Sequence, residues 1–162
     1  MIEIQNRGKN LFSNSQFNEI TTLYQKATYL GDNTYLLKGN LDTRDILANY
    51  LTLKKGQTIY LDFDFVEGSK NVYAYIERGI INSDNSFSRI EQIYNPFGSG
   101  AVTWDFTNQG KLSWTVTKTG TYIVGILTDY GVTPPVIIKN FQITLSELEY
   151  SPALNEKLQL NI

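Results

Sequence analysis

The chain alternates apolar and polar residues with a period of two over most of its length, and the clearest run is residues 59 to 66. Successive side chains of a β-strand point to opposite faces, so this period predicts strands with one face on a core. Turn residues separate many short runs of this kind, and a sustained helical period is missing. These features predict an all-β protein, a two-sheet antiparallel β-sandwich.

The predicted strands follow the alternation. Further strands are expected at 72–77, 102–107, 112–117 and 136–148, and near 23–30 and 34–38. Residues 121–128 are apolar at nearly every position, which is typical of a central strand covered on both faces. Asn108-Gln109-Gly110 predicts a hairpin connection between two of the strands. The side chains expected in the core are Phe63, Phe65, Trp104, Trp114, Val116 and Ile123.

Residues 42–50 are the one ambiguous stretch. Ile46, Leu47 and Tyr50 fit a short helix that begins at Asp42 or Thr43, and they also fit an extended segment. We favour a single helical turn. The 162 residues are otherwise expected to form one domain over 10–162, and residues 1–9 are expected to be an extension or linker.

The sequence contains no His and no Cys, which excludes several kinds of chemistry. Nucleophile systems that use imidazole as the base cannot form, and neither can zinc sites built on imidazole or thiolate. Any chemistry would have to use carboxylates, Lys, Tyr or hydroxyl groups. Because nothing in the sequence indicates a pocket for it, we expect a protein that is not an enzyme. No cofactor is required, and any metal is expected to be a hard cation held by oxygen atoms.

The charge pattern and the hydropathy limit the partners. The net charge is −2 and the Lys and Arg residues are scattered, so nucleic acid is not an expected partner. No apolar stretch is long enough to span a bilayer, and residues 1–5 lack the pattern of a signal peptide. We expect no membrane insertion and synthesis in the cytoplasm without a signal peptide.

Three segments resemble known motifs. Residues 10–17, NLFSNSQF, are similar to the N-L-x-x-N-S-x-F entry of jelly-roll carbohydrate-binding modules. Residues 150–156, YSPALNE, resemble the aromatic-S-P-A exit of such modules in tailed-phage tail and baseplate proteins. Residues 53–63, LKKGQTIYLDF, resemble a strand entry of the same modules.

The resemblance implies that the β-sandwich is a jelly roll, and that it serves as a non-catalytic carbohydrate-binding accessory module of a phage tail or baseplate. It implies location in the virion, attachment to cell-wall or surface polysaccharide of the bacterial host, and contact with other tail or baseplate proteins. The alternative is a structural tail or baseplate module that mediates protein assembly without binding sugar.

Two outward rows of side chains are the best candidates for saccharide contact. Sugars are bound by aromatic faces together with carboxylates or amides that pair with hydroxyl groups. The alternative interpretation is an ordinary solvated sheet face on which Tyr serves cross-strand packing. The loops that carry Arg89, Tyr94 and Tyr130 are a second candidate place for saccharide binding. The predicted contacts are Asp62, Asp64, Tyr73, Tyr75 and Glu77 on strands, and Arg89, Tyr94 and Tyr130 in loops.

Calcium is a further expectation. The resemblance implies a structural Ca²⁺ near the chain entry, where Asn14, Ser15, Asn18 and Glu19 offer oxygen atoms. The alternative is an N-terminal loop held by Asn side-chain hydrogen bonds. Asp62 and Asp64 are also spaced as an acid and base pair, but no feature of the sequence indicates a pocket for catalysis.

Overall fold

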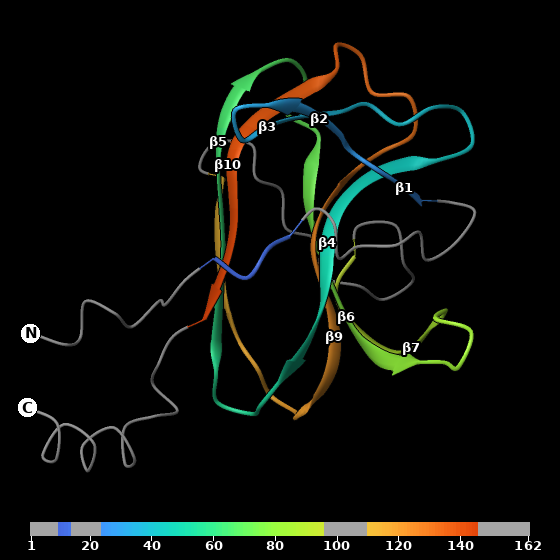
Figure 1. The fold of residues 1–162 in the computed structure, drawn as a ribbon, viewed down its shortest axis with the longest axis vertical. Coiled ribbons are helices and arrows are strands. Elements are labelled where there is room, and N and C mark those ends of the chain that lie inside the picture. Colours follow the sequence, from blue (N-terminus) through green and yellow to red (C-terminus); the bar gives the residue numbers. More distant parts are fainter. Residues whose placement is uncertain (1–9, 14–23, 96–109, 146–162) are drawn as a thin grey trace, which may run out of the picture.

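The computed structural model describes residues 10–13, 24–95 and 110–145 (Figure 1). Ten strands and no helix occur in these ranges, and they form two five-stranded sheets. The first sheet has the order β1 (Tyr24–Lys26), β4 (Arg44–Leu53), β9 (Gly120–Thr128), β6 (Val72–Ile81) and β7 (Phe87–Tyr94). The second has the order β2 (Thr28–Gly31), β3 (Thr34–Leu37), β10 (Val136–Leu145), β5 (Thr58–Glu67) and β8 (Lys111–Thr115).

The strand order is that of a jelly roll. From β3 to β10 the chain crosses to the other sheet at every step except from β6 to β7. This leaves the sets β4-β9-β6-β7 and β3-β10-β5-β8 facing each other, which is the two-sheet jelly-roll arrangement. Neighbouring strands are antiparallel apart from β1, which pairs with β4 in parallel. The predicted β-sandwich is confirmed.

The main core lies between the two sheets. Strand β5 contributes Ile59, Leu61 and Phe63 to it, and Val116 lies in the same cluster. Strand β9 is the central strand of the first sheet and is buried from Tyr122 to Thr128, as its apolar run predicts. Its Ile123 lies in a second, smaller cluster on the other face of that sheet.

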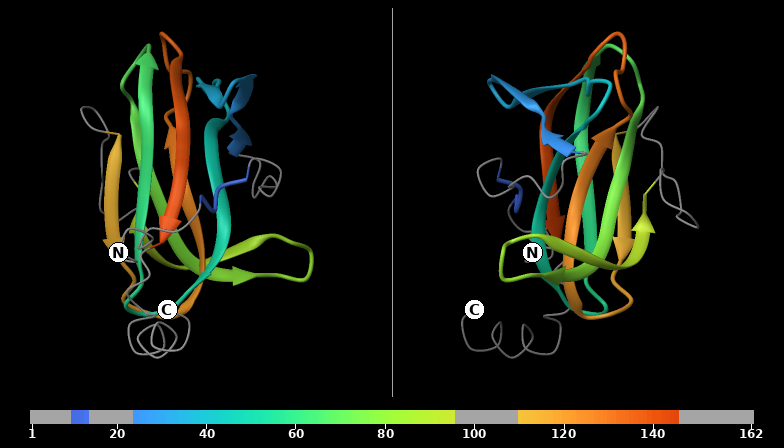
Figure 2. Two further views of the ribbon diagram at one scale, coloured as in Figure 1. Left: turned by 60° about the vertical axis from the view of Figure 1, so that its left-hand side comes forward. Right: turned by 90° about the vertical axis from the view of Figure 1, so that its right-hand side faces the viewer.

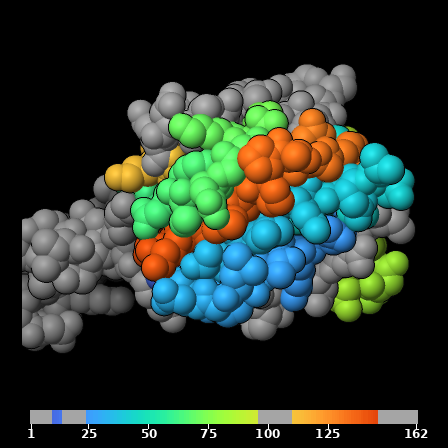
Figure 3. All heavy atoms as spheres, turned by 90° about the horizontal axis from the view of Figure 1, so that it is seen from above, coloured from blue at the N-terminus to red at the C-terminus, as the bar shows by residue number. Residues whose placement is uncertain are grey.

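The molecule seen in Figures 1 and 2 has two layers with one projecting element. Strands β5 and β10 run together in one layer and β4, β9 and β6 in the other. The hairpin of β6 and β7 extends sideways beyond the sandwich (Figure 2). Seen from above, β2 and β3, β10 and β5 lie side by side across one end (Figure 3). Within the described ranges, no helix has the length and apolar character needed to cross a membrane.

The short helix predicted within 42–50 is wrong, because β4 occupies Arg44–Leu53. Asp45 to Asn49 are all buried, and β4 pairs with β9 from Ile46 to Leu53. The apparent helical spacing arises because both faces of this strand are covered, which removes the alternation of an ordinary half-buried strand.

The sequence does not predict strand β7, because its first residues belong to a polar segment typical of a loop. It lies at the edge of the first sheet, and Ser88, Arg89 and Ile90 are all exposed. Because an edge strand in the projecting hairpin has little core to face, its sequence lacks the usual alternation.

The predicted core is confirmed only in part. Phe63, Val116 and Ile123 are buried, and Trp114 is half-buried against Tyr122 with 5.5 Å between ring centroids. Phe65 is 39% exposed, so this prediction is wrong. Its place in β5 lies beyond the core, where a register shift against β10 breaks the alternation. Trp104 and the hairpin connection 108–109 lie outside the described residues.

Candidate functional site

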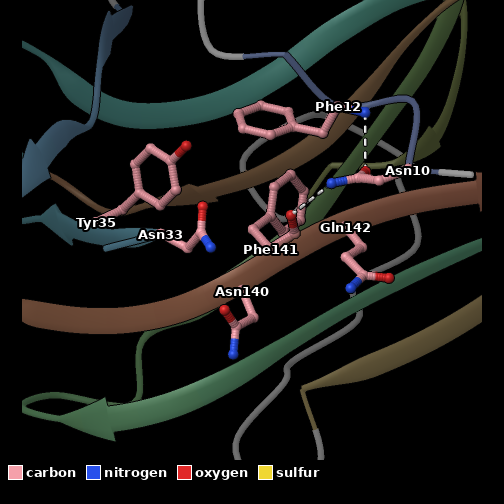
Figure 4. Close-up of a pocket in the computed structure, with 7 residues that line it drawn as sticks. All are labelled: Asn10, Phe12, Asn33, Tyr35, Asn140, Phe141 and Gln142. Carbon is pink, nitrogen blue, oxygen red and sulfur yellow. Dashed lines mark hydrogen bonds between the residues drawn. The ribbon is translucent and has the colours of Figure 1, made fainter. Parts of the chain in front are cut away.

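Two hollows adjoin each other along β10, on the second sheet. The first, here called the amide hollow, has a volume of about 190 Å³ and is shown in Figure 4. The second, the carboxylate hollow, has a volume of about 330 Å³. The amide hollow is lined by Asn10, Phe12, Asn33, Tyr35, Asn140, Phe141 and Gln142. The carboxylate hollow is lined by Asp62, Phe63, Asp64, Lys111, Asn140 and Gln142. Asn140 and Gln142 therefore belong to both.

The amide hollow lies where β10 changes its neighbour. Strand β3 pairs with β10 from Val136 to Lys139, and further along the Leu11 N–H donates to the Ile143 carbonyl at 2.7 Å. Between these two neighbours, Asn140 has a left-handed backbone with φ of +60°. The register between β10 and β5 also shifts between Lys139 and Gln142. The bulge therefore directs side chains of β10 toward the gap between β3 and Leu11.

Residues 10–13, here called the entry segment, are held against β10 by hydrogen bonds of Asn10. Its Oδ1 accepts hydrogen bonds from Ile143 N and Phe12 N, both at 2.9 Å, and its Nδ2 donates to the Phe141 carbonyl at 3.3 Å. On the other side, Asn49 of β4 bonds both backbone groups of Ser13. The first residues of the NLFSNSQF motif therefore connect β10, the central strand of the second sheet, with β4 of the first sheet.

The amide hollow combines rings with uncharged polar groups. Phe12 packs edge-on against Phe141 and Tyr35, with centroid distances of 4.8 and 6.0 Å. Tyr35 and Phe141 are buried, whereas Asn10, Asn33 and Gln142 are exposed. The Asn10 amide is already bonded at both its ends, so Asn33 and Gln142 carry the accessible amides. In Figure 4 Phe141 lies on the opposite side of the β10 ribbon from Asn140 and Gln142. Amides supply both donors and acceptors, which suits a ligand rich in hydroxyl groups.

The carboxylate hollow carries two of the predicted contacts. Asp62 and Asp64 alternate with Phe63 on β5, so both carboxylates lie on the outer face of the second sheet. Lys111 is the direct neighbour of Asp62 across the β5–β8 pair. Asn140 Nδ2 donates to Asp64 Oδ2 at 2.9 Å, which links the two hollows.

The other predicted strand contacts belong to the first sheet. Tyr75 and Glu77 are each 3% exposed, and Tyr73 is half-buried. The expectation that they form an outward, solvent-facing row is wrong, because the outer face of β6 is covered as well as the inner one. Tyr75 belongs to the small cluster with Ile46 and Ile123, and Tyr73 packs against it. These three residues do not join Asp62 and Asp64 in one site.

Glu77 is the centre of a buried polar network. Tyr75 Oη donates to Glu77 Oε1 at 2.7 Å, and Asn95 Nδ2 donates to Oε2 at 2.8 Å. Arg89 Nη1 lies 3.4 Å from the same Oε2. Burial, followed by the Glu77 carboxylate, raises the pKa of Tyr75 and of Tyr24. The network stabilises the base of the β6–β7 hairpin.

The predicted loop contacts are scattered. Arg89 lies on β7 at the Glu77 network, and Tyr94 is half-buried against the main core, where burial raises its pKa. Tyr130 is 37% exposed, and its hydroxyl accepts a hydrogen bond from Arg44 Nη1 at 3.0 Å. The Arg44 guanidinium also lies 3.9 Å from the Tyr130 ring centroid.

The predicted calcium ligands Asn14, Ser15, Asn18 and Glu19 lie outside the described residues. Within the ranges that are described, no group of three or more acidic side chains is arranged to hold a metal ion. The calcium expectation therefore stays a prediction.

Sequence reasoning missed Asn33, Asn140 and Gln142. For Asn140 a signal was present, since Lys139 and Asn140 are two consecutive polar residues between Ile138 and Phe141. Such a break in the alternation of a strand is typical of a bulge. Asn33 and Gln142 carry no local signal, because only the pairing of β3 with β10 brings them together.

Comparisons with known proteins do not assign the chain to a family. No family model matches, and no curated protein matches. Among solved structures, the chain is similar to a periplasmic inhibitor of g-type lysozyme, PliG from Aeromonas hydrophila. The two are 16% identical, and the match covers 76% of this chain and 96% of the other with a TM-score of 0.38.

Proposed function

We propose that this protein is a non-catalytic saccharide-binding module whose site is formed by the amide and carboxylate hollows. The observation that carries the proposal is their junction at Asn140 and Gln142, where amides adjoin the carboxylates of Asp62 and Asp64 on the outer face of the second sheet. Saccharide hydroxyls are both donors and acceptors, and this set of side chains offers partners of both kinds. Charged groups alone would serve an ionic ligand better.

The proposed setting is a tailed-phage tail or baseplate, with host cell-wall or surface polysaccharide as the ligand. Its support is the resemblance of the opening, closing and strand-entry motifs. Binding by a single copy should be weak, in the range of about micromolar to millimolar, because water competes for exposed hydrogen bonds. Many copies on one virion would supply avidity.

A glycan array and a pulldown with intact bacterial cells test the proposal. The informative variant replaces Asp62 and Gln142 together with Ala, because one lines the carboxylate hollow and the other lines both. Ser113→Ala is the matched control, since Ser113 is exposed on the neighbouring strand outside both hollows. We expect binding to be lost in the double variant and kept in the control. Equal binding by all three proteins would contradict the proposed site.

A second candidate function is docking to another protein of the assembly. It is favoured by the β6–β7 hairpin, where Ile80, Ile81 and Ile90 are exposed on the projecting element (Figure 2). Exposed apolar side chains gathered on one element often mark an interaction surface. Replacing all three with Ser should leave glycan binding unchanged and remove incorporation into the assembly. If incorporation is unchanged, the hairpin is not the docking element.

A further inference from the structure

We propose that Asp64 orients the side-chain amide of Asn140. The side-chain oxygen of Asn140 thereby becomes a fixed hydrogen-bond acceptor, which selects saccharides that place a hydrogen-bond donor against it. The inference rests on the proposed function and deepens it. It assigns a positioning role to Asp64 and a specificity role to Asn140.

The backbone places the Asn140 side chain between the two hollows. At φ of +60°, Asn140 is left-handed, a conformation that Asn tolerates better than most other residues with a side chain. Its N–H donates to the Asn33 carbonyl at 2.8 Å, which ties the bulge to the turn between β2 and β3. The position of the side chain is therefore set by backbone bonds, before any ligand is present.

The carboxylate then decides which way the amide faces. An ionised carboxylate only accepts hydrogen bonds, so the group that approaches Asp64 Oδ2 at 2.9 Å is the Asn140 nitrogen. The Asn140 oxygen consequently points the other way. In Figure 4 it lies on the side of Asn33, within the amide hollow. Among the described residues, no group donates to this oxygen.

A fixed acceptor discriminates between ligands. A saccharide that presents a hydroxyl or an acetamido N–H at this oxygen forms a hydrogen bond of about 0.5 to 1.5 kcal/mol net. A saccharide that presents an ether oxygen there leaves two acceptors facing each other. Without Asp64, the amide can rotate and offer its N–H instead, so the discrimination should relax.

The test uses the full chain, labelled with ¹⁵N, and follows the Asn140 side-chain amide by NMR with and without sugar. Cellopentaose and cellopentaose with its hydroxyls converted to methyl ethers are the probes, because one presents hydroxyl donors and the other presents only ether oxygens. The variants are Asn140→Gly, which keeps a left-handed backbone accessible, Asp64→Ala and Asp64→Asn. Ser113→Ala is again the control, and unfolding midpoints verify that each variant is folded.

We expect the Asn140 amide signal to shift on sugar binding in the parent. Asn140→Gly and Asp64→Ala should weaken binding about two- to tenfold, the equivalent of one hydrogen bond. Asp64→Asn should lose less, since its oxygen still accepts from Asn140. Asp64→Ala should also narrow the affinity difference between the two probes, which a purely structural role would not do.

Three results would overturn the inference. Parent-like affinity and probe preference in Asn140→Gly would remove the specificity role. Parent-like behaviour in Asp64→Ala, with a loss in Asn140→Gly, would remove the positioning role. An unchanged Asn140 amide signal in sugar-free Asp64→Ala would also remove it. If neither probe shifts any signal of the parent, the proposed function fails for these sugars. The sugar-free spectra of the parent and of Asp64→Ala still show whether Asp64 orients the Asn140 amide.

Discussion

Asn49 shows how a single buried polar residue connects distant parts of the chain. It is fully buried on β4, and its amide bonds the Ser13 N–H at 2.8 Å and the Ser13 carbonyl at 2.9 Å. The side chain thus imitates the backbone of a neighbouring strand. A buried amide is costly unless both its ends are paired, and here the entry segment pairs them.

We predict that Asn49→Ala lowers the free energy of unfolding by about 1 to 3 kcal/mol, because Ser13 loses two partners in a partly buried place. Urea denaturation of the variant measures this directly. Thr52→Ala, an exposed position on the same strand, is the control and should change stability by less than about 0.5 kcal/mol. Equal effects of the two substitutions would contradict the role of Asn49.

Buried tyrosines make stability depend on alkaline pH. Burial, followed by the Glu77 carboxylate, raises the pKa of Tyr75 above its ordinary value of 10.0. The folded state then holds the proton more strongly than the unfolded state. This contribution is fully present below pH 10 and is lost as the pH rises further.

We predict that the free energy of unfolding falls as the pH rises above about 10, and that Tyr75→Phe makes this fall shallower. The variant should also lose about 1 to 3 kcal/mol at neutral pH, because Glu77 loses a donor. Denaturant midpoints at pH 8, 10 and 11 provide the comparison. Parallel pH profiles for parent and variant would show that Tyr75 does not contribute.

At the scale of elements, the first sheet depends on close approach between its central strands. A Cβ at Gly125 of β9 would lie 2.0 Å from the Leu47 carbonyl oxygen and 2.6 Å from Ala48 Cα on β4. Both contacts involve backbone, which cannot move without separating the strands. A Cβ at Gly120 of the same strand meets only the Arg78 side chain, at 3.2 Å.

We predict that Gly125→Ala destabilises the protein by about 1 to 3 kcal/mol or more, whereas Gly120→Ala is close to neutral because Arg78 can move aside. The two substitutions add the same methyl group to the same strand. Thermal unfolding followed by circular dichroism compares them. If both variants melt together with the parent, the packing between β4 and β9 is looser than described.

At the scale of the whole molecule, the entry segment closes the sandwich between β10 and β4. Asn10 and Leu11 bond to β10, and Ser13 bonds to Asn49. We predict that removing residues 1–9 leaves the unfolding free energy unchanged. Removing residues 1–13 should lower it by about 2 to 5 kcal/mol, because several hydrogen bonds and the packing of Phe12 are lost. Denaturant titration of both truncated chains tests the predicted domain limit, which a loss in the shorter truncation would contradict.

The sequence by itself determined the all-β class, the central strand β9 and the outward direction of Asp62 and Asp64. Each depends on local alternation, which the periodicity of a strand converts directly into faces. The tertiary structure alone decided the rest. Strand β4 looked helical because both its faces are covered, and Tyr75 and Glu77 looked exposed although their side of β6 is covered too. The candidate site forms only when β3 and the entry segment meet β10 at a bulge, a relation between residues more than a hundred positions apart that no local pattern records.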